Sequence, residues 1–194
     1  AYSQEQINQL IVDNALTYGH VVRLKGGDPF IFGRGSEEIE HAESFGIPTF
    51  VVPGISSSIA VPAYQGISLT KRGVSESFWV ITGTTSARKL SDDVQLAAKS
   101  TATVVILMGM SKLAQIVALF QEESKGETPI AIIQNGTTPE ERIGVGTIDT
   151  IEAVVAAHNL SNPAIIVIGE VVKESNKLKG FYEEFIVASG RDLT

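Results

Sequence analysis

The residues best suited to chemistry lie in a glycine-rich stretch near the N-terminus. Gly26-Gly27-Asp28 directly follows the apolar residues 20–24, a pattern typical of a β-strand. Open α/β sheets bind ligands at the carboxyl ends of their strands, and glycine lets the backbone approach a small molecule closely. Asp28 adds a carboxylate there. The stretch therefore favours a small-molecule site, with an ordinary turn as the alternative. Its spacing fits neither a phosphate-binding loop nor a dinucleotide motif.

Five of the fifteen basic residues lie in or beside loops at predicted sheet edges. Guanidinium groups pair well with carboxylates. The chain as a whole is acidic, with a net charge of −7, so it repels a phosphate backbone. The pattern indicates an anionic small-molecule substrate rather than a nucleic acid, with solvated loop charges as the alternative. The five residues are Arg23, Lys25, Arg34, Lys71 and Arg72.

Three other loops also follow predicted strands, at residues 52–58, 107–110 and 134–139. In a two-layered α/β architecture, all of these loops are able to face one cleft. Each has a simpler interpretation as well. Ser56 and Ser57 suit a helix cap, Met108 suits a core position, and Asn135-Gly136 suits a turn.

The elements that must position these loops alternate regularly along the chain. Short apolar strands separated by helices predict an α/β fold with mainly parallel or mixed sheets, covered on both faces. Expected strands are residues 20–24, 48–52, 77–82, 101–108, 129–134, 142–148 and 163–168. Expected helices are residues 3–19, opened by a Ser3/Gln6 capping box and closed by Gly19, then 36–45, 56–64, 112–121 and 150–158.

We expect two domains and a tail. Residues 1–72 form the remainder of an N-terminal α/β domain, because an opening helix indicates that a preceding strand and loop are missing. Residues 77–173 form a C-terminal α/β domain, and residues 174–194 a polar tail. Apolar residues that are candidates for docking part of this last region are Val171, Val172, Phe181, Tyr182, Phe185 and Ile186.

Composition excludes several classes of protein. The chain has no cysteine and three scattered histidines, which argues against disulfide frameworks, thiolate nucleophiles and a metal site. Neither a signal peptide nor an apolar run of membrane-spanning length occurs in the sequence, so we expect a soluble, cytoplasmic protein.

The motifs taken in order resemble the uroporphyrinogen-III C-methyltransferases of the tetrapyrrole methylase superfamily. The resemblance covers about residues 3–173 and is carried by residues 21–38, 51–57, 63–72, the Met108-Gly109 pair, 134–137 and 163–170. It implies two α/β domains with a cleft between them, usually in a homodimer. It also implies transfer of methyl groups from S-adenosylmethionine to ring carbons of uroporphyrinogen III, giving precorrin-2 for siroheme or cobalamin. Alternatives are another precorrin methylase, or a non-catalytic relative that only binds a ligand or partner.

The resemblance also implies roles for individual residues. Arg34 is the candidate catalytic residue, assisting proton removal, and Glu37, Arg72 and Met108 contact the tetrapyrrole. The residues implied to bind the methyl donor are Gly26, Gly27, Asp28, Ile31, Ser56, Ser57, Met108 and Gly136.

The chain departs from the family pattern at two places. The catalytic aspartate and lysine that the family usually carries upstream have no counterpart here. Thr82-Gly83-Thr84 stands where the family commonly has Thr-Gly-His, which removes an imidazole expected to contact substrate.

Overall fold

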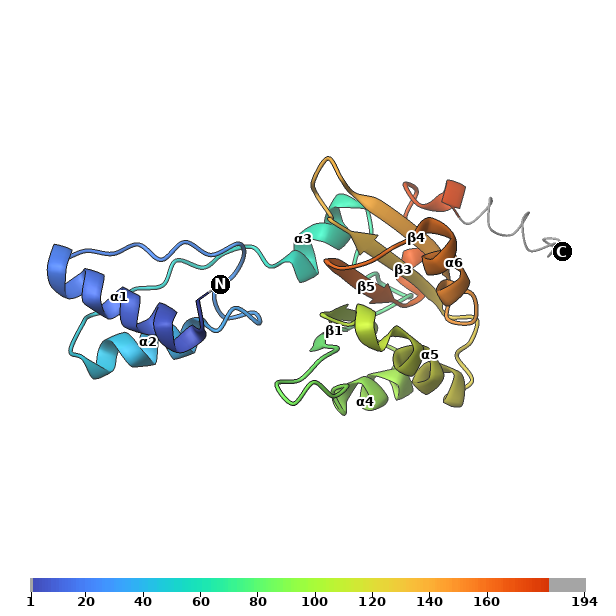
Figure 1. The fold of residues 1–194 in the computed structure, drawn as a ribbon. Helices are drawn as coiled ribbons and strands as arrows, with labels where there is room; N and C mark the ends of the chain where they lie inside the picture. Colours follow the sequence, from blue (N-terminus) through green and yellow to red (C-terminus); the bar gives the residue numbers. More distant parts are fainter. Residues whose placement is uncertain (1, 182–194) are drawn as a thin grey trace, which may run out of the picture. The chain divides into compact units, whose positions relative to one another are not determined.

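The computed structural model describes residues 2–181 and contains two compact units (Figure 1). The first unit extends to Ser56 and the second begins at Ser57. This is a division by packing. It does not test the expected domains at 1–72 and 77–173, which remain a prediction.

Two helices form the body of the first unit. Helix α1 (Gln4–Tyr18) packs against α2 (Gly35–Ser44). The expected capping box opens α1: the Gln6 amide donates to Ser3 Oγ at 3.2 Å, and the Ser3 amide donates to Gln6 Oε1 at 2.8 Å. Gly19 ends the helix in the left-handed conformation, at φ 77°. The sequence prediction for α1 is therefore confirmed at both ends.

The strands expected at residues 20–24 and 48–52 are not present, and this prediction was wrong. Neither segment makes a backbone–backbone hydrogen bond with residues 2–181. Most of their apolar side chains are exposed, from 37% for Val21 to 90% for Phe50. A β-strand requires a neighbouring ladder, and in the described residues neither segment has one. An apolar pattern alone therefore did not specify pairing.

The second unit is built on a five-stranded sheet of order β1-β2-β5-β3-β4. β1–β2 is a parallel pair, whereas β2–β5, β5–β3 and β3–β4 are antiparallel. A mainly parallel or a mixed sheet was expected from the sequence, and the observed sheet is mixed. Its strands are β1 (Phe78–Thr82), β2 (Thr103–Leu107), β3 (Pro129–Gln134), β4 (Arg142–Thr147) and β5 (Ala164–Ile168).

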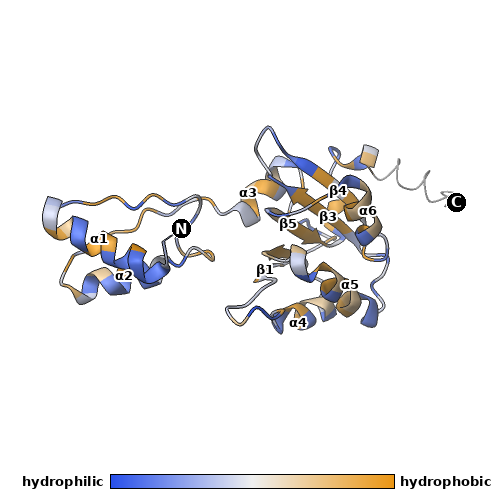
Figure 2. Ribbon diagram, viewed as in Figure 1, coloured by the Kyte–Doolittle hydropathy of each residue, from blue (hydrophilic) through white to orange (hydrophobic). Residues whose placement is uncertain are grey.

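Helices cover both faces of this sheet, as expected. One apolar core contains residues of α4 (Asp93–Lys99), α5 (Leu113–Glu122) and α6 (Ile151–His158) packed on alternate strand positions such as Ile106 and Ile132. The opposite core joins α3 (Ser57–Tyr64) to the intervening strand positions, such as Val105 and Ile133. Figure 2 shows the apolar sheet between more polar helix surfaces. Helix α4 was absent from the sequence prediction.

The chain after β5 packs against the same unit. A short 3₁₀ helix (Glu170–Val172) buries Val171 and Val172, as their apolar character indicated. Ser175 and Leu178 are also buried, which the expectation of a solvated chain after Lys173 did not include. Phe181 is 39% exposed. Tyr182, Phe185 and Ile186 lie outside the described residues.

Two further features are absent from residues 2–181. None of the helices there combines the length and apolar character needed to cross a bilayer. That part of the chain also holds no group of three or more acidic, histidine or cysteine side chains placed to bind a metal ion.

Candidate functional site

Two glycine-containing loops of the first unit lie in direct contact. A Cβ atom on Gly54 would lie 2.7 Å from the Gly27 carbonyl oxygen and 3.1 Å from Asp28 Cα. Only glycine fits at such a separation without displacing backbone. The structure thus brings the predicted donor residues Gly27 and Asp28 against the loop that ends in Ser56.

Asp28 fastens these loops together. Its Oδ1 accepts the Phe30 amide at 2.9 Å and its Oδ2 accepts the Gly54 amide at 3.0 Å. Hydrogen bonds from Phe30 and Gly54 hold the pKa of Asp28 below its ordinary value. The ionised carboxylate has further lone pairs for a ligand donor. Ile31, beside this loop, is 44% exposed and available for apolar contact.

Arg34 and Glu37 form a two-pronged ion pair at the start of α2. Arg34 Nε donates to Glu37 Oε1 at 2.8 Å, and a terminal guanidinium nitrogen donates to Oε2 at 2.6 Å. The Glu37 carboxylate raises the pKa of Arg34, and Arg34 lowers the pKa of Glu37. Arg34 therefore stays protonated, so it is suited to stabilising negative charge and unsuited to accepting a proton itself.

Most of the predicted anion-binding residues already have partners. Arg23 and Lys25 both bind Glu38, at 3.2 and 2.8 Å, and Lys71 binds Glu174. Burial opposes ionisation of Glu38, but the bond from Lys25 and its other partners outweigh it and lower the pKa. Within residues 2–181, Arg72 makes no ion pair. Arg72 and the exposed Arg34 pair are therefore the most accessible of the five.

In the second unit, two residues predicted to bind the methyl donor lie at the same end of the sheet's strands. β2 and β3 run parallel to each other across β5, so Met108 and Asn135-Gly136 both follow carboxyl strand ends. Leu107 and Ile133 are both in register with Ile165. The structure thus brings these two segments to the same sheet edge.

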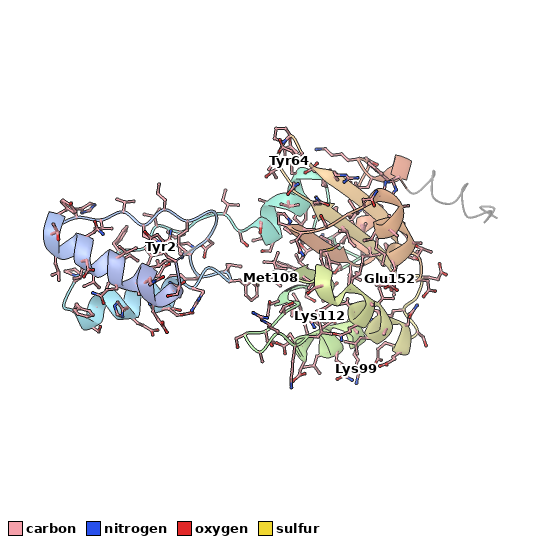
Figure 3. All side chains as sticks on the ribbon, in the orientation of Figure 1. Tyr2, Tyr64, Lys99, Met108, Lys112 and Glu152 are labelled. Atoms are coloured by element: carbon pink, nitrogen blue, oxygen red, sulfur yellow. The ribbon has the colours of Figure 1, made fainter. Side chains whose placement is uncertain are left out.

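Met108, which is labelled in Figure 3, lies in a tightly packed part of the backbone. It has a left-handed φ of 55° and its side chain is half exposed. A Cβ on Gly83 would lie 2.4 Å from Gly109 Cα, and Thr84 Oγ1 donates to the Met108 carbonyl at 2.8 Å. Thr84, at the position where the family commonly has histidine, therefore supports the Met108 backbone. Nothing in the local sequence indicates this contact.

Gly136 packs tightly against α3. A Cβ there would lie 2.4 Å from Val61 Cγ1. The serines at the start of α3 differ in environment, since Ser56 is buried and Ser57 is exposed. Gly26, Gly27, Asp28, Ile31 and Ser56 belong to the first unit, and Ser57, Met108 and Gly136 to the second. The roles of all these residues in binding remain predictions.

A separate groove of about 530 Å³ lies in the first unit. Of the residues predicted to bind an anionic substrate it contains Arg23, and it contains none of the predicted methyl-donor residues. Its lining is largely apolar and comes from α1 and the segment after it, namely Ile7, Leu10, Ile11, Asn14, Tyr18, His20, Val21, Val22 and Arg23.

The second unit has an α/β fold in which the loops containing Met108 and Gly136 follow carboxyl strand ends. Comparison with known families makes this specific: the family described as Tetrapyrrole (Corrin/Porphyrin) Methylases matches residues 2–152. The chain belongs to this family.

Similar proteins carry related names. The chain is 45% identical over 174 residues to the uroporphyrinogen-III C-methyltransferase of Methanocaldococcus jannaschii, covering 89% of this chain and 72% of that protein. It is 40% identical to the siroheme synthase of Chromobacterium violaceum, covering 93% of this chain and 39% of the relative. A crystal structure of uroporphyrin-III C-methyl transferase from Thermus thermophilus, complexed with S-adenyl homocysteine, superposes with a TM-score of 0.77 at 31% identity. That match covers 88% of this chain and 75% of the other.

Proposed function

We propose that this protein is an S-adenosylmethionine-dependent methyltransferase that methylates carbons of uroporphyrinogen III, giving precorrin-2 for siroheme or cobalamin. The observation that carries the proposal is the 45% identity, over 89% of the chain, to a uroporphyrinogen-III C-methyltransferase. A solved relative holding S-adenosylhomocysteine, the product of the donor, supports the choice of cofactor.

The methyl donor fits the loops of each unit in chemical character. Gly26, Gly27 and Asp28 offer close backbone approach and an ionised carboxylate, while Met108 and Gly136 offer an exposed thioether and a tight turn at a sheet edge. We assign donor binding to these residues together with Ile31, Ser56 and Ser57.

The tetrapyrrole is rich in carboxylates, so its binding calls for guanidinium groups. We assign this role to Arg34 and Arg72, with Glu37 orienting Arg34 and Met108 contacting the ring. Ion pairs between exposed side chains are weak, because water screens the two charges. A substrate carboxylate can therefore displace Glu37 from Arg34 at little cost.

The protein catalyses the reaction mainly by holding the methyl donor and the ring carbon in the right geometry. S-adenosylmethionine supplies an activated methyl group, which passes to an electron-rich ring carbon as its bond to sulfur breaks. The methylated ring system then loses a proton to restore neutrality. Because Arg34 remains protonated, its contribution is to stabilise a nearby base or the substrate carboxylates electrostatically.

We also propose that the protein acts in the cytoplasm as a homodimer with no nucleic-acid partner. The support is its similarity to small-molecule biosynthetic enzymes and its acidic net charge of −7. Sedimentation equilibrium tests the homodimer directly, and a single species at the 20.7 kDa monomer mass would contradict it.

The test of function is transfer of labelled methyl from S-adenosylmethionine to uroporphyrinogen III, with the product mass recorded. Arg34→Ala should lower turnover about ten- to a hundredfold, since it removes one electrostatic contact in the reaction, while S-adenosylhomocysteine binding stays unchanged. Lys99→Ala, which removes an exposed cation on α4, is the control (Figure 3). Methylation of a later precorrin but not uroporphyrinogen III, or binding without transfer, would replace the proposal.

A further inference from the structure

The loop after β3 holds two residues in a backbone conformation that side chains other than glycine rarely adopt. Asn135 has φ 49° and Thr137 has φ 70°, on either side of Gly136. The left-handed region is tolerated by asparagine, but for a β-branched residue such as threonine it is an outlier. Such conformations persist only where the surrounding structure determines them.

One carboxylate holds the strained threonine. The Thr137 amide donates to Glu141 Oε2 at 2.8 Å. The other oxygen of the same carboxylate, Oε1, accepts Gln65 Nε2 at 2.5 Å. Glu141 thus connects the backbone of the loop to a side chain that lies 76 positions earlier in the chain.

Gln65 is itself firmly placed. The residue is 5% exposed, and its backbone carbonyl accepts a hydrogen bond from the hydroxyl of the buried Ser175 at 2.6 Å. Its backbone amide donates to the carbonyls of Val61 and Pro62 in α3. Val61 is also the residue against which Gly136 packs. Val61 of α3 and Gln65, the residue that follows this helix, therefore fix the loop at two points.

We propose that Gln65 is a positioning residue for methyl-donor binding. Through Glu141, it holds Gly136 and Thr137 in the conformation that receives the donor. The proposal rests on the proposed function, because it takes Gly136 as part of the donor site. Gln65 itself acts through the loop and need not touch the donor.

The test combines calorimetry with S-adenosylhomocysteine and amide hydrogen exchange at residues 135–138. Gln65→Leu replaces the side-chain amide with an apolar group of similar size and so removes the hydrogen-bond donor to Glu141. We expect it to raise the Kd about tenfold, the loss of one hydrogen bond to a charged group, and to accelerate exchange in the loop.

Two variants separate positioning from general stability. Ser175→Ala removes the hydrogen bond to the Gln65 backbone carbonyl without touching the side-chain contact to the loop, so it should lower Tm and leave Kd and loop exchange unchanged. Glu141→Gln retains an oxygen that accepts the Thr137 amide, and it keeps a hydrogen bond to Gln65 if the Gln65 side-chain amide rotates. This variant should therefore bind S-adenosylhomocysteine about as tightly as the parent chain. Glu141→Ala loses both bonds and should behave like Gln65→Leu. The alanine variant also serves if Gln65→Leu fails to fold.

The outcomes are distinguishable. Unchanged loop exchange in both Gln65→Leu and Glu141→Ala would overturn the positioning role. Faster exchange with unchanged Kd would overturn the link between this loop and the donor. No S-adenosylhomocysteine binding by the unsubstituted chain would instead contradict the proposed function itself.

Discussion

Single glycines decide how closely the candidate loops approach their neighbours. Gly54 and Gly136 each lie where a Cβ would come within 2.7 Å of another atom, backbone in the first case and a valine side chain in the second. Gly26 has nothing within 4 Å of such a position. Glycines of the three candidate loops therefore have different physical roles, some structural and some available to a ligand.

Gly54→Ala should destabilise the first unit by about 1–3 kcal/mol, the usual cost of forcing extra volume into a packed position. The reason is the 2.7 Å approach to the Gly27 carbonyl. Gly26→Ala is the matched control and should leave stability nearly unchanged. Denaturant unfolding measured by amide signals of α1 and α2 checks both, and equal stability of the two variants would contradict the close contact.

Asp28 should make the first unit sensitive to acid. Its folded-state pKa is lowered by the Phe30 and Gly54 amides, so the stabilisation is present above the unfolded-state pKa and is lost as the pH falls through the folded-state value. Asp28→Asn should weaken this acid-dependent loss. An NMR titration of the Gly54 amide checks the claim, and a signal that does not follow Asp28 ionisation would contradict it.

At the scale of elements, the sequence predicted the second unit well. β3 was expected with its observed bounds, because five consecutive apolar residues and Gln134 precede the Asn135-Gly136 turn. Residues 48–52 carry a similar apolar pattern but have no strand beside them in the described residues. The pattern records a preference for extended chain, whereas a strand also needs a partner, which local sequence does not reveal.

The candidate site was predictable to a similar extent. Glycine-rich loops after strands could be located, but their contacts could not. The approach of Gly136 to Val61 joins positions 75 residues apart and depends on how α3 packs. The ion pairs that Arg23 and Lys25 form with Glu38 were likewise not predictable. They depend on where α2 places the buried Glu38 carboxylate, and they occupy two residues that were predicted to bind an anion.

Glu38→Gln should show that this carboxylate holds α2 in the first unit. Glu38 and Lys25 have side chains only 6% and 13% exposed, so removing the charge should cost about 2 kcal/mol. Glu37→Gln, on the exposed side of the same helix, is the control and should change stability much less, because water screens its ion pair with Arg34. Thermal unfolding checks both, and equal Tm values would contradict a structural role for Glu38.

At the scale of the whole molecule, the two units differ in the size of their cores. From residue 2 to Ser56 the buried hydrophobic residues are Val12 and Ala42. The second unit contains both extended apolar cores. Stability should therefore be unevenly distributed along the chain, because burial of apolar surface is the main favourable term.

Hydrogen exchange should reveal this difference. Amides of α1 and α2 should exchange faster than those of β3 and β5, and they should lose protection at a lower denaturant concentration. Exchange measured by mass spectrometry on the intact chain provides the comparison. Equal protection in both units, lost together, would contradict the unequal cores.

The central claim is that the protein binds a methyl donor and that the loop containing Gly136 contributes to this binding. Isothermal titration calorimetry of the chain with S-adenosylhomocysteine tests it most directly. We predict saturable binding that Gly136→Ala weakens, because the added methyl group would collide with Val61. Binding of the same strength by the Gly136→Ala variant, or no heat of binding with the folded parent chain, would contradict the account.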